Sequence, residues 1–432
     1  MDQADPAWRA AGPDAGALGA AERIAVLCDD GSFQPEAVAE GAAVRLGCGR
    51  VDGRVVRVFA LDPMAARGAI GAAEAAAITA LIGAAVRFAT PVVALLETAG
   101  TRRSDGLAGL AALAAVQRAL ARAACHVPRI AVVCGPCDGA AAALATLADL
   151  RFMAAPRGRL LLSDARLAAA VADEITGEAA LGGAGLHGSV TGLVDRVFAD
   201  EVTALREVRN CLGFLPPVRC LPTADPPARE TPALATWHAD DAAPARDIGE
   251  VIAAIADESA FLALQPGFAP NLVCGFTRLM GRTIGILANQ PQVLAGALDA
   301  DALRKAARFV RLCDGFGLKL VTLVDTPGFV PGRAQAARGI VAALGELVAA
   351  CAAAGNVRVT VVVGRSIGGA GAAMVSRALG ADRVLAWHGA AIALAGGGPA
   401  DTTAAIACGA IDALIAPAQT RAQIAAALSM FD

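Results

Sequence analysis

Short runs of β-branched and other apolar residues alternate along this chain with longer, alanine-rich stretches. The short runs are typical of strands, and the longer stretches are typical of helices. Strands that alternate with helices of this length indicate βαβ units with parallel pairing, which places the chain in the α/β class. The expected strands span 55–61, 92–97, 130–134, 284–288, 321–325 and 359–363, and the expected helices span 72–88, 106–124, 139–148, 301–316, 340–354 and 368–379.

The second half of the chain repeats the first half. Three successive segments match at offsets of 228, 228 and 229 positions, a regularity that chance rarely produces. The matching pairs are 49–60 with 277–288, 92–100 with 320–328, and 129–135 with 358–364. We therefore expect two copies of one domain, at 21–215 and 245–432, with a tail at 1–20 and a proline-rich linker at 216–244.

Composition excludes several classes of protein. The 37 Lys and Arg residues nearly balance the 40 Asp and Glu residues, and this formal charge of −3 does not favour binding to nucleic acid or to a membrane surface. No run of about 18 large apolar residues could span a membrane. The 11 cysteines are scattered, and the first 20 residues lack the pattern of a secretory signal, so we expect reduced thiols in the cytoplasm. Charged residues make up only 18% of the chain, which suggests surface buried between subunits of an oligomer.

A glycine-rich turn follows a buried strand and precedes a helix in each half. The turns span 135–140 and 364–370. Backbone N–H groups at the start of a helix have no partner within it, and with the helix dipole they can stabilise a developing negative charge. The alternative is a tight turn that only permits close helix packing. Two such turns at matching places in two repeats favour a functional role.

The helices after both turns contain no acid or base, and the four histidines lie elsewhere. If the chain is an enzyme, backbone electrostatics would carry the reaction, and a bound substrate or cofactor would supply the base. This favours enolate chemistry on a thioester. Cys134 and Cys137 have the spacing of a redox or zinc pair, but no second pair completes a metal site. We expect them to be buried structural thiols, and we expect no metal.

Four stretches of the second half identify a family. The segments 273–291, 294–299, 305–314 and 324–332 closely resemble the carboxyltransferase (β) subunit of acyl-CoA carboxylases, of the propionyl-CoA carboxylase type. The first half resembles the same family more loosely through 127–130, 135–137, 176–178, 181–184 and 200–201. The similarity runs from about Glu22 to the end of the chain.

The resemblance implies two tandem crotonase-like ββα-spiral domains related by internal duplication. It also implies a ring of dimers, with active sites formed between the N-domain of one chain and the C-domain of its partner. In this family, carboxybiotin on a carrier protein releases CO2 and the biotin removes the α-proton of an acyl-CoA, whose enolate then captures the CO2. The implied partners are a biotin carboxylase, a biotin carboxyl carrier protein and an acyl-CoA or carrier-protein thioester.

The resemblance also implies site residues. The family's two oxyanion holes fall on Gly139 and Ala140 in the first half and on Gly369 and Ala370 in the second half. We expect the first hole to hold the thioester oxygen and the second to hold the ureido oxygen of biotin. The family position that tunes the choice of acyl chain falls on Ala372. Further candidates for substrate binding are Gly68, Gly100, Arg102, Gly328 and Gly368.

Departures from the family pattern leave other functions open. The Gly-Gly pair of the first domain becomes Gly139-Ala140, and basic residues expected on the first long helix become Ala75, Ala76 and Ala77. Besides an active biotin-dependent carboxyltransferase, the chain could be a biotin-independent decarboxylase of a malonyl-type thioester or a non-catalytic subunit of a carboxylase complex. A crotonase-type hydratase is a more distant alternative, because paired carboxylates are missing near the holes.

Overall fold

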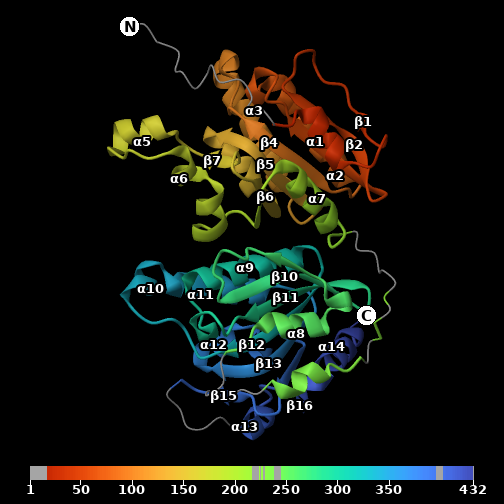
Figure 1. The fold of residues 1–432 in the computed structure, drawn as a ribbon, viewed down its shortest axis with the longest axis vertical. Helices are drawn as coiled ribbons and strands as arrows, with labels where there is room; N and C mark the ends of the chain where they lie inside the picture. Colours follow the sequence, from red (N-terminus) through yellow and green to blue (C-terminus); the bar gives the residue numbers. More distant parts are fainter. Residues whose placement is uncertain are drawn as a thin grey trace. The chain divides into compact units, whose positions relative to one another are not determined.

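A computed structural model describes residues 17–216, 223, 225–226, 229–237, 245–395 and 402–431. The chain divides into two compact units, Met1–Leu212 and Gly213–Asp432. Figure 1 colours the first unit from red to yellow-green and the second from green to blue. Each unit holds one sheet with helices packed against it.

The first unit is built on an eight-stranded sheet. Strands β2 and β3 form an antiparallel hairpin, and the pairs β3–β4, β4–β5, β5–β6 and β6–β8 are parallel. The sheet order is β1-β2-β3-β4-β5-β6-β8, and β7 pairs with the end of β5. The strands are β1 (Gln34–Pro35), β2 (Val44–Val51), β3 (Arg54–Leu61), β4 (Val92–Thr98), β5 (Arg129–Asp138), β6 (Leu150–Ala154), β7 (Arg159–Leu161) and β8 (Arg196–Phe198).

The second unit has the matching sheet. The order β16-β14-β13-β12-β11-β10-β9 mirrors that of the first unit, and β15 pairs with the end of β13 as β7 pairs with β5. This correspondence confirms the α/β class and the expected duplication. The strands are β9 (Phe261–Leu264), β10 (Leu272–Leu279), β11 (Arg282–Asn289), β12 (Lys319–Thr326), β13 (Arg358–Ile367), β14 (Arg383–Trp387), β15 (Ala391–Ala393) and β16 (Ala413–Ile415).

The hairpin of each unit turns through the same two-residue loop. In the first unit, Asp52 and Gly53 have φ of 49° and 74°, and in the second, Met280 and Gly281 have φ of 57° and 74°. A two-residue loop with positive φ at both positions twists the chain in the sense that the flanking strands require. Glycine adopts this conformation without a steric penalty, which explains why it recurs at the second position of both loops.

Helices cover the sheets with their apolar faces. In the first unit, α2 and α3 pack against each other and bury Ile78, Leu81 and Val116 in the core. In the second unit, α9 and α11 form the equivalent pair. The helices are α1 (Ala20–Leu27), α2 (Ala72–Arg87), α3 (Gly106–Arg122), α4 (Ala143–Thr146), α5 (Ala165–Ala172), α6 (Glu178–Gly182), α7 (Glu201–Leu212), α8 (Ile248–Ile255), α9 (Ala300–Gly315), α10 (Arg333–Ala337), α11 (Ile340–Ala353), α12 (Gly368–Ala373), α13 (Thr402–Ala407) and α14 (Thr420–Ser429).

Two expected helices are shorter than predicted. The segment 139–148 forms a 3-10 turn at Gly139–Ala142 and then only the short helix α4. The segment 368–379 forms α12, which ends at Ala373, and a separate 3-10 turn at Arg377–Leu379. The helix cannot continue between them because Val375 has a φ of 55°, outside the right-handed helical region.

The expected linker at 216–244 is not a free connection over its described part. Leu234 and Trp237 are buried in the core of the second unit, and the Trp237 ring meets that of Trp387 edge-on, with ring centroids 6.0 Å apart. Thr231 donates its backbone N–H to the carbonyl of Ala418 at 2.8 Å. Residues 229–237 therefore belong to the second unit, since they bury apolar surface there.

A buried lysine holds a loop of the second unit. Lys305 on α9 is 2% exposed. Its ammonium donates hydrogen bonds to the backbone carbonyls of Gln265, Phe268 and Leu272 at 2.9, 2.8 and 2.6 Å, with Ala269 further off at 3.3 Å. Gln265, Phe268 and Ala269 lie in the loop between β9 and β10, and Leu272 begins β10, so this one buried side chain ties the loop to the start of the strand.

We predict that Lys305→Met destabilises the chain. Methionine keeps the apolar stem but removes every donor, and an unsatisfied buried acceptor costs about 1–3 kcal/mol. The midpoint of urea denaturation should fall, with faster amide hydrogen exchange at 265–272. Lys319→Met is the control, because Lys319 is only half-buried and donates to the carbonyl of Leu428 at 2.7 Å. If the midpoint of denaturation falls equally in both variants, the hydrogen bonds of Lys305 have no special role in stability.

Candidate active site

Both glycine-rich turns lie at the carboxyl end of a central strand. In the first unit, β5 ends at Asp138 and Gly139 follows with a φ of 62°. In the second unit, β13 ends at Ile367 and Gly368 follows with a φ of 58°. Glycine suits these two positions because side chains rarely adopt positive φ. In both units the chain then turns directly into a helical segment.

The first N–H groups of the two turns have no acceptor within the helical segment that follows them. The first N–H groups of a helix precede its first internal hydrogen bond and lack an acceptor within it. In the first unit Gly139 is half-buried and Ala140 is exposed, and in the second unit Gly368 is half-buried and Gly369 is exposed. Ala140 thus corresponds to Gly369, whereas Ala370 corresponds to the buried Ala141. By this repeat, Gly368 and Gly369 correspond to Gly139 and Ala140, one position before the predicted pair Gly369 and Ala370, and the role of these residues as donors stays a prediction.

A second glycine packs against each strand end. A Cβ atom on Gly68 would lie 2.1 Å from the carbonyl oxygen of Glu97. A Cβ atom on Gly296 would lie 2.2 Å from the carbonyl oxygen of Asp325. Both glycines have positive φ, of 67° and 80°. Sequence analysis selected Gly68 and missed Gly296, which the repeat offset of 228 would have found.

The predicted glycines Gly100 and Gly328 lie beside the turns. Gly100 accepts a hydrogen bond from the N–H of Ile70 at 2.9 Å, and a Cβ on Gly100 would lie 3.0 Å from the carbonyl oxygen of Asp138. Gly328 accepts the equivalent bond from Leu298 at 3.0 Å. The structure therefore brings Gly68, Gly100 and the first turn together within one unit.

A carboxylate lies directly behind each turn. The strand register shifts at Glu97 on β4 and at Asp325 on β12, and such irregularities re-aim a side chain. A Cβ atom on Gly135 would lie 2.3 Å from Cδ of Glu97, and one on Gly364 would lie 2.5 Å from Cγ of Asp325. Each turn therefore packs against an acidic side chain, which leaves no room for a side chain at Gly135 or Gly364.

In the first unit, two arginines compensate the charge of the Glu97 carboxylate. The guanidinium of Arg23, which is fully buried, donates to Glu97 and to Glu201 on α7, the latter at 2.6 Å. Arg157 donates to the same two carboxylates at 2.5 and 2.8 Å. Burial raises the pKa of the adjacent Cys134 thiol to about 12, so this thiol stays neutral. These ion pairs hold the Glu97 side chain in place behind the first turn.

In the second unit, the equivalent carboxylate has a local partner. Asp325 accepts hydrogen bonds from the backbone N–H and from Nε of Arg365 at 3.0 and 2.9 Å. Asn289 holds the backbone N–H of Asp325 through its side-chain oxygen at 3.2 Å. The two units therefore support the same backbone shape with different side chains.

Arg102 has a structural partner. Its guanidinium forms an ion pair with the buried carboxylate of Glu74, which also accepts the backbone N–H groups of Ala43 and Gly71 at 2.8 and 2.9 Å. This network holds the start of α2. The binding of a CoA phosphate by Arg102 stays a prediction. Cys134 and Cys137 are buried free thiols, as expected, and no group of three metal-ligating side chains occurs among the described residues.

Sequence analysis missed one acid beside the first turn. Asp138, the last residue of β5, directly precedes Gly139 and is half-buried. Burial raises the pKa of its carboxyl, the nearby Glu178 carboxylate raises it further, and the guanidinium of Arg67 opposes the shift. Asp138 precedes the helices, where an acid would be expected. The signal was a lone charged residue at the end of an apolar strand.

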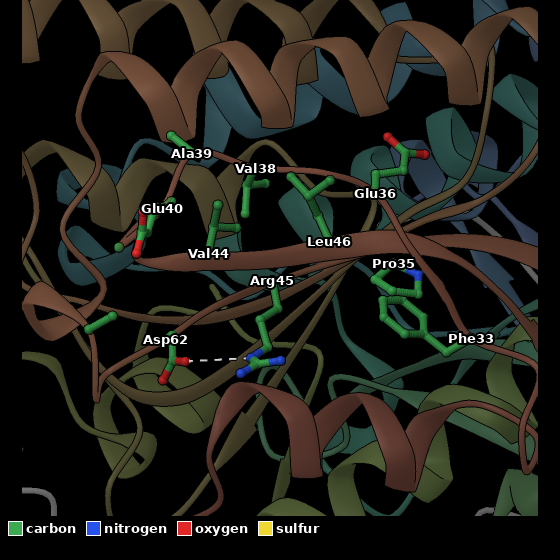
Figure 2. A pocket seen from close by; sticks show the side chains of 13 residues that line it. Phe33, Pro35, Glu36, Val38, Ala39, Glu40, Val44, Arg45, Leu46 and Asp62 are labelled. Atoms are coloured by element: carbon green, nitrogen blue, oxygen red, sulfur yellow. Dashed lines mark ion pairs between the residues drawn. The ribbon is translucent and has the colours of Figure 1, made fainter.

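A groove of about 430 Å³ lies elsewhere in the first unit, beside β2 (Figure 2). Val44 and Leu46 line it together with the carboxylates of Glu36 and Glu40. The one guanidinium drawn there, that of Arg45, faces Asp62 at 3.8 Å. These acidic side chains would repel a phosphate, so the groove is not a candidate for binding the nucleotide part of CoA.

Comparison with known proteins identifies the family. The model of the carboxyl transferase domain matches residues 13–403. The chain belongs to the carboxyl transferase family. It is 36% identical to the propionyl-CoA carboxylase beta chain of Cereibacter sphaeroides over 88% of this chain and 79% of that one. It is 33% identical to methylmalonyl-CoA decarboxylase subunit alpha of Veillonella parvula over the same shares.

The solved structures confirm the fold of this carboxyl transferase. The hexameric transcarboxylase 12S, solved with hydrolysed methylmalonyl-coenzyme A bound, superposes with a TM-score of 0.92 at 31% identity, covering 96% of this chain and 90% of that chain. The prediction of two tandem crotonase-like domains and the stated family resemblance are thereby confirmed. Among the described residues, no helix is long and apolar enough to cross a membrane.

We predict that Arg23→Met strongly destabilises the carboxyl transferase. The variant leaves Glu97 and Glu201 buried with one arginine in place of two, and removing one partner of a buried ion pair costs about 3–5 kcal/mol. Urea denaturation followed by circular dichroism measures the loss. Arg45→Met is the matched control, because Arg45 is 61% exposed and its pair with Asp62 should contribute less than about 1 kcal/mol. If the two variants lose similar amounts of stability, the cluster of Arg23, Glu97 and Glu201 does not contribute specially to the stability of the fold.

Proposed function

We propose that this chain transfers a carboxyl group to the α-carbon of an acyl-CoA through a thioester enolate held by backbone N–H groups. The observation that carries this proposal is the pair of equivalent N–H turns, one at the end of β5 and one at the end of β13. Family membership and the relatives named propionyl-CoA carboxylase and transcarboxylase support the same reaction.

The first turn would hold the thioester oxygen. The N–H groups of Gly139 and Ala140 would donate to this oxygen as it gains charge on the way to the enolate. One such donor typically contributes about 100- to 1,000-fold to the rate, because it is already oriented and needs no reorganisation. The cluster of Arg23, Glu97 and Glu201 supplies this orientation from behind.

The second turn fits the ureido oxygen of biotin. Its donors are neutral N–H groups, and among the described residues the edge of Phe329, at 3.4 Å, is what approaches the Cβ position of Gly369. Biotin carried by a partner would supply the carboxyl group and accept the α-proton when bound. A biotin carboxylase and a biotin carboxyl carrier protein are the partners that this reaction requires.

Two alternatives differ in their support. Asp138 beside the first turn favours an additional decarboxylase activity, and one relative is named as a subunit of methylmalonyl-CoA decarboxylase. A non-catalytic subunit would not need a left-handed glycine turn at both strand ends, yet Gly139 and Gly368 both have positive φ.

We also propose a homo-oligomer. Leu162, Val171 and Ile175 around α5 are 80%, 78% and 98% exposed in the single chain, and apolar side chains this exposed mark an interaction surface when they lie together. The transcarboxylase relative is a hexamer. The cytoplasmic location stays a prediction.

The reaction can be tested in reverse with small substrates. Purified chain is mixed with methylmalonyl-CoA or malonyl-CoA, with and without free biotin, and the decarboxylated thioester is measured by chromatography. Formation of propionyl-CoA or acetyl-CoA that rises with biotin supports the proposal. If biotin does not change the rate of turnover of either thioester, the proposal is overturned.

We predict that Gly369→Val lowers this biotin-dependent turnover at least about 100-fold, because its side chain would cover the N–H donors. The chain should fold, since the φ of Gly369 lies outside the left-handed region and its Cβ position is open except for Phe329. Gly345→Val on α11 is the control, as nothing lies within 4 Å of its Cβ position. A folded Gly369→Val chain with the wild-type rate would show that this turn is not part of the active site.

We predict that Ala372→Ile shifts the preference toward shorter acyl groups. Ala372 is exposed while its neighbours Gly371 and Ala373 are buried, so its side chain is not packed into the described part of its own chain. Each methylene that fits contributes about 0.8 kcal/mol, close to fourfold in binding. Specificity constants for acetyl, propionyl and butyryl thioesters measure the effect. An unchanged order of preference would contradict a role for Ala372 in the choice of acyl group.

A further inference from the structure

Asp138 occupies the position closest in sequence to the first N–H turn. Its backbone pairs with Leu161 of β7, and its carbonyl oxygen lies 3.0 Å from the Cβ position of Gly100. The next residue along the β5 chain path, Gly139, is the first predicted donor. The carboxyl-bearing residue is therefore the direct chain neighbour of that donor.

The carboxyl of Asp138 has no partner among the described residues. It takes part in no hydrogen bond and no ion pair there. By contrast, every carboxylate that is buried in the described structure is paired or hydrogen-bonded, namely Glu74, Glu97, Asp195, Glu201, Asp257 and Asp325. A half-buried acid without a partner has no evident structural use, and such groups cluster at functional sites.

The second turn lacks this acid. The structural repeat places Ile367 where the first unit has Asp138, since each is the last strand residue before the left-handed glycine. The duplicated backbone does not need a carboxyl at this position. Asp138 is therefore a feature of the first turn alone, where the thioester is expected.

We propose that Asp138 is the proton donor of a second activity, the biotin-independent decarboxylation of the carboxylated thioester. This inference rests on the proposed function, because it requires the thioester enolate to form at the first turn. The bond between the α-carbon and the carboxylate carbon breaks, and its electron pair stays on the thioester as the enolate. CO2 leaves. The enolate carbon then takes the proton of the Asp138 carboxyl, and solvent returns a proton to the carboxylate.

Electrostatics at the turn favour this role. An ionised carboxylate beside the N–H donors would oppose charge on the enolate oxygen, whereas the protonated acid opposes nothing and can donate. The charged groups that act on the Asp138 carboxyl are Glu178 at the start of α6, Asp164 before α5, Arg159 on β7 and Arg67 before α2. Burial and the Glu178 and Asp164 carboxylates raise the pKa of Asp138, and Arg67 and Arg159 lower it, with a net upward shift.

The test separates two reactions of one substrate. Methylmalonyl-CoA is given to the full chain without biotin, where CO2 release reports decarboxylation, and with free biotin, where the additional turnover reports carboxyl transfer. Carboxyl transfer exchanges a proton for the carboxyl group between its two substrates and needs no proton from the protein. The readout is the rate of CO2 release without biotin divided by the additional turnover with biotin. Asp138→Asn should lower this ratio about 100-fold, because general acid catalysis typically contributes 100- to 10,000-fold.

The pH dependence supplies a second readout that a purely structural role would not move. In the wild type, CO2 release should be constant below the pKa of Asp138 and fall as the pH rises through it, since only the protonated acid donates. This decline should be absent in Asp138→Asn. In Glu178→Gln it should move to lower pH, because the loss of a neighbouring negative charge lowers the pKa of Asp138.

The possible outcomes are distinct. If wild type transfers the carboxyl group but releases no CO2 without biotin, the second activity is absent and the proposed function survives. If Asp138→Asn lowers both rates equally, Asp138 only shapes the turn and the inference is overturned. If CO2 release depends on Asp138 but biotin has no effect, the inference stands and the proposed carboxyl transfer fails.

Discussion

The carboxylate behind each glycine turn is the constraint on which the rest of the site depends. Glu97 and Asp325 lie where the strand register shifts, and each fills the space that a side chain at Gly135 or Gly364 would need. The turn can therefore approach the carboxylate only as bare backbone. This fixes where the strand ends, where the following helix begins and in which direction its first N–H groups point.

The two units meet this constraint with different side chains. In the first, the carboxylate is compensated across the fold, by Arg23 from α1 and by Arg157 from the loop after β6. In the second, Arg365 of the same turn does so locally. A backbone shape that persists while its supports change indicates that the N–H geometry, and not any one side chain, is what the duplication preserved.

The sequence predicted those features that depend on local pattern. The strand cores and the repeat followed from apolar runs and from glycines at fixed offsets. Strand ends were placed too early, as β5 runs to Asp138 and not to 134, because polar residues continue the pairing with β7. The partner of Arg102 could not be foreseen, since Glu74 lies 28 positions away and meets it only through the fold.

The site shows the same division between local pattern and fold. The resemblance predicted which residues act as donors, and the structure shows that Gly369, not Ala370, corresponds to Ala140. It also showed that the two turns, alike in backbone, differ in electrostatics, because an unpaired carboxyl stands before one and an isoleucine before the other. A turn with a titratable neighbour can stabilise an oxyanion well in one protonation state and poorly in the other. The two turns therefore differ in their titratable neighbours, which are Glu97 and Asp138 at the first turn and Asp325, paired with Arg365, at the second.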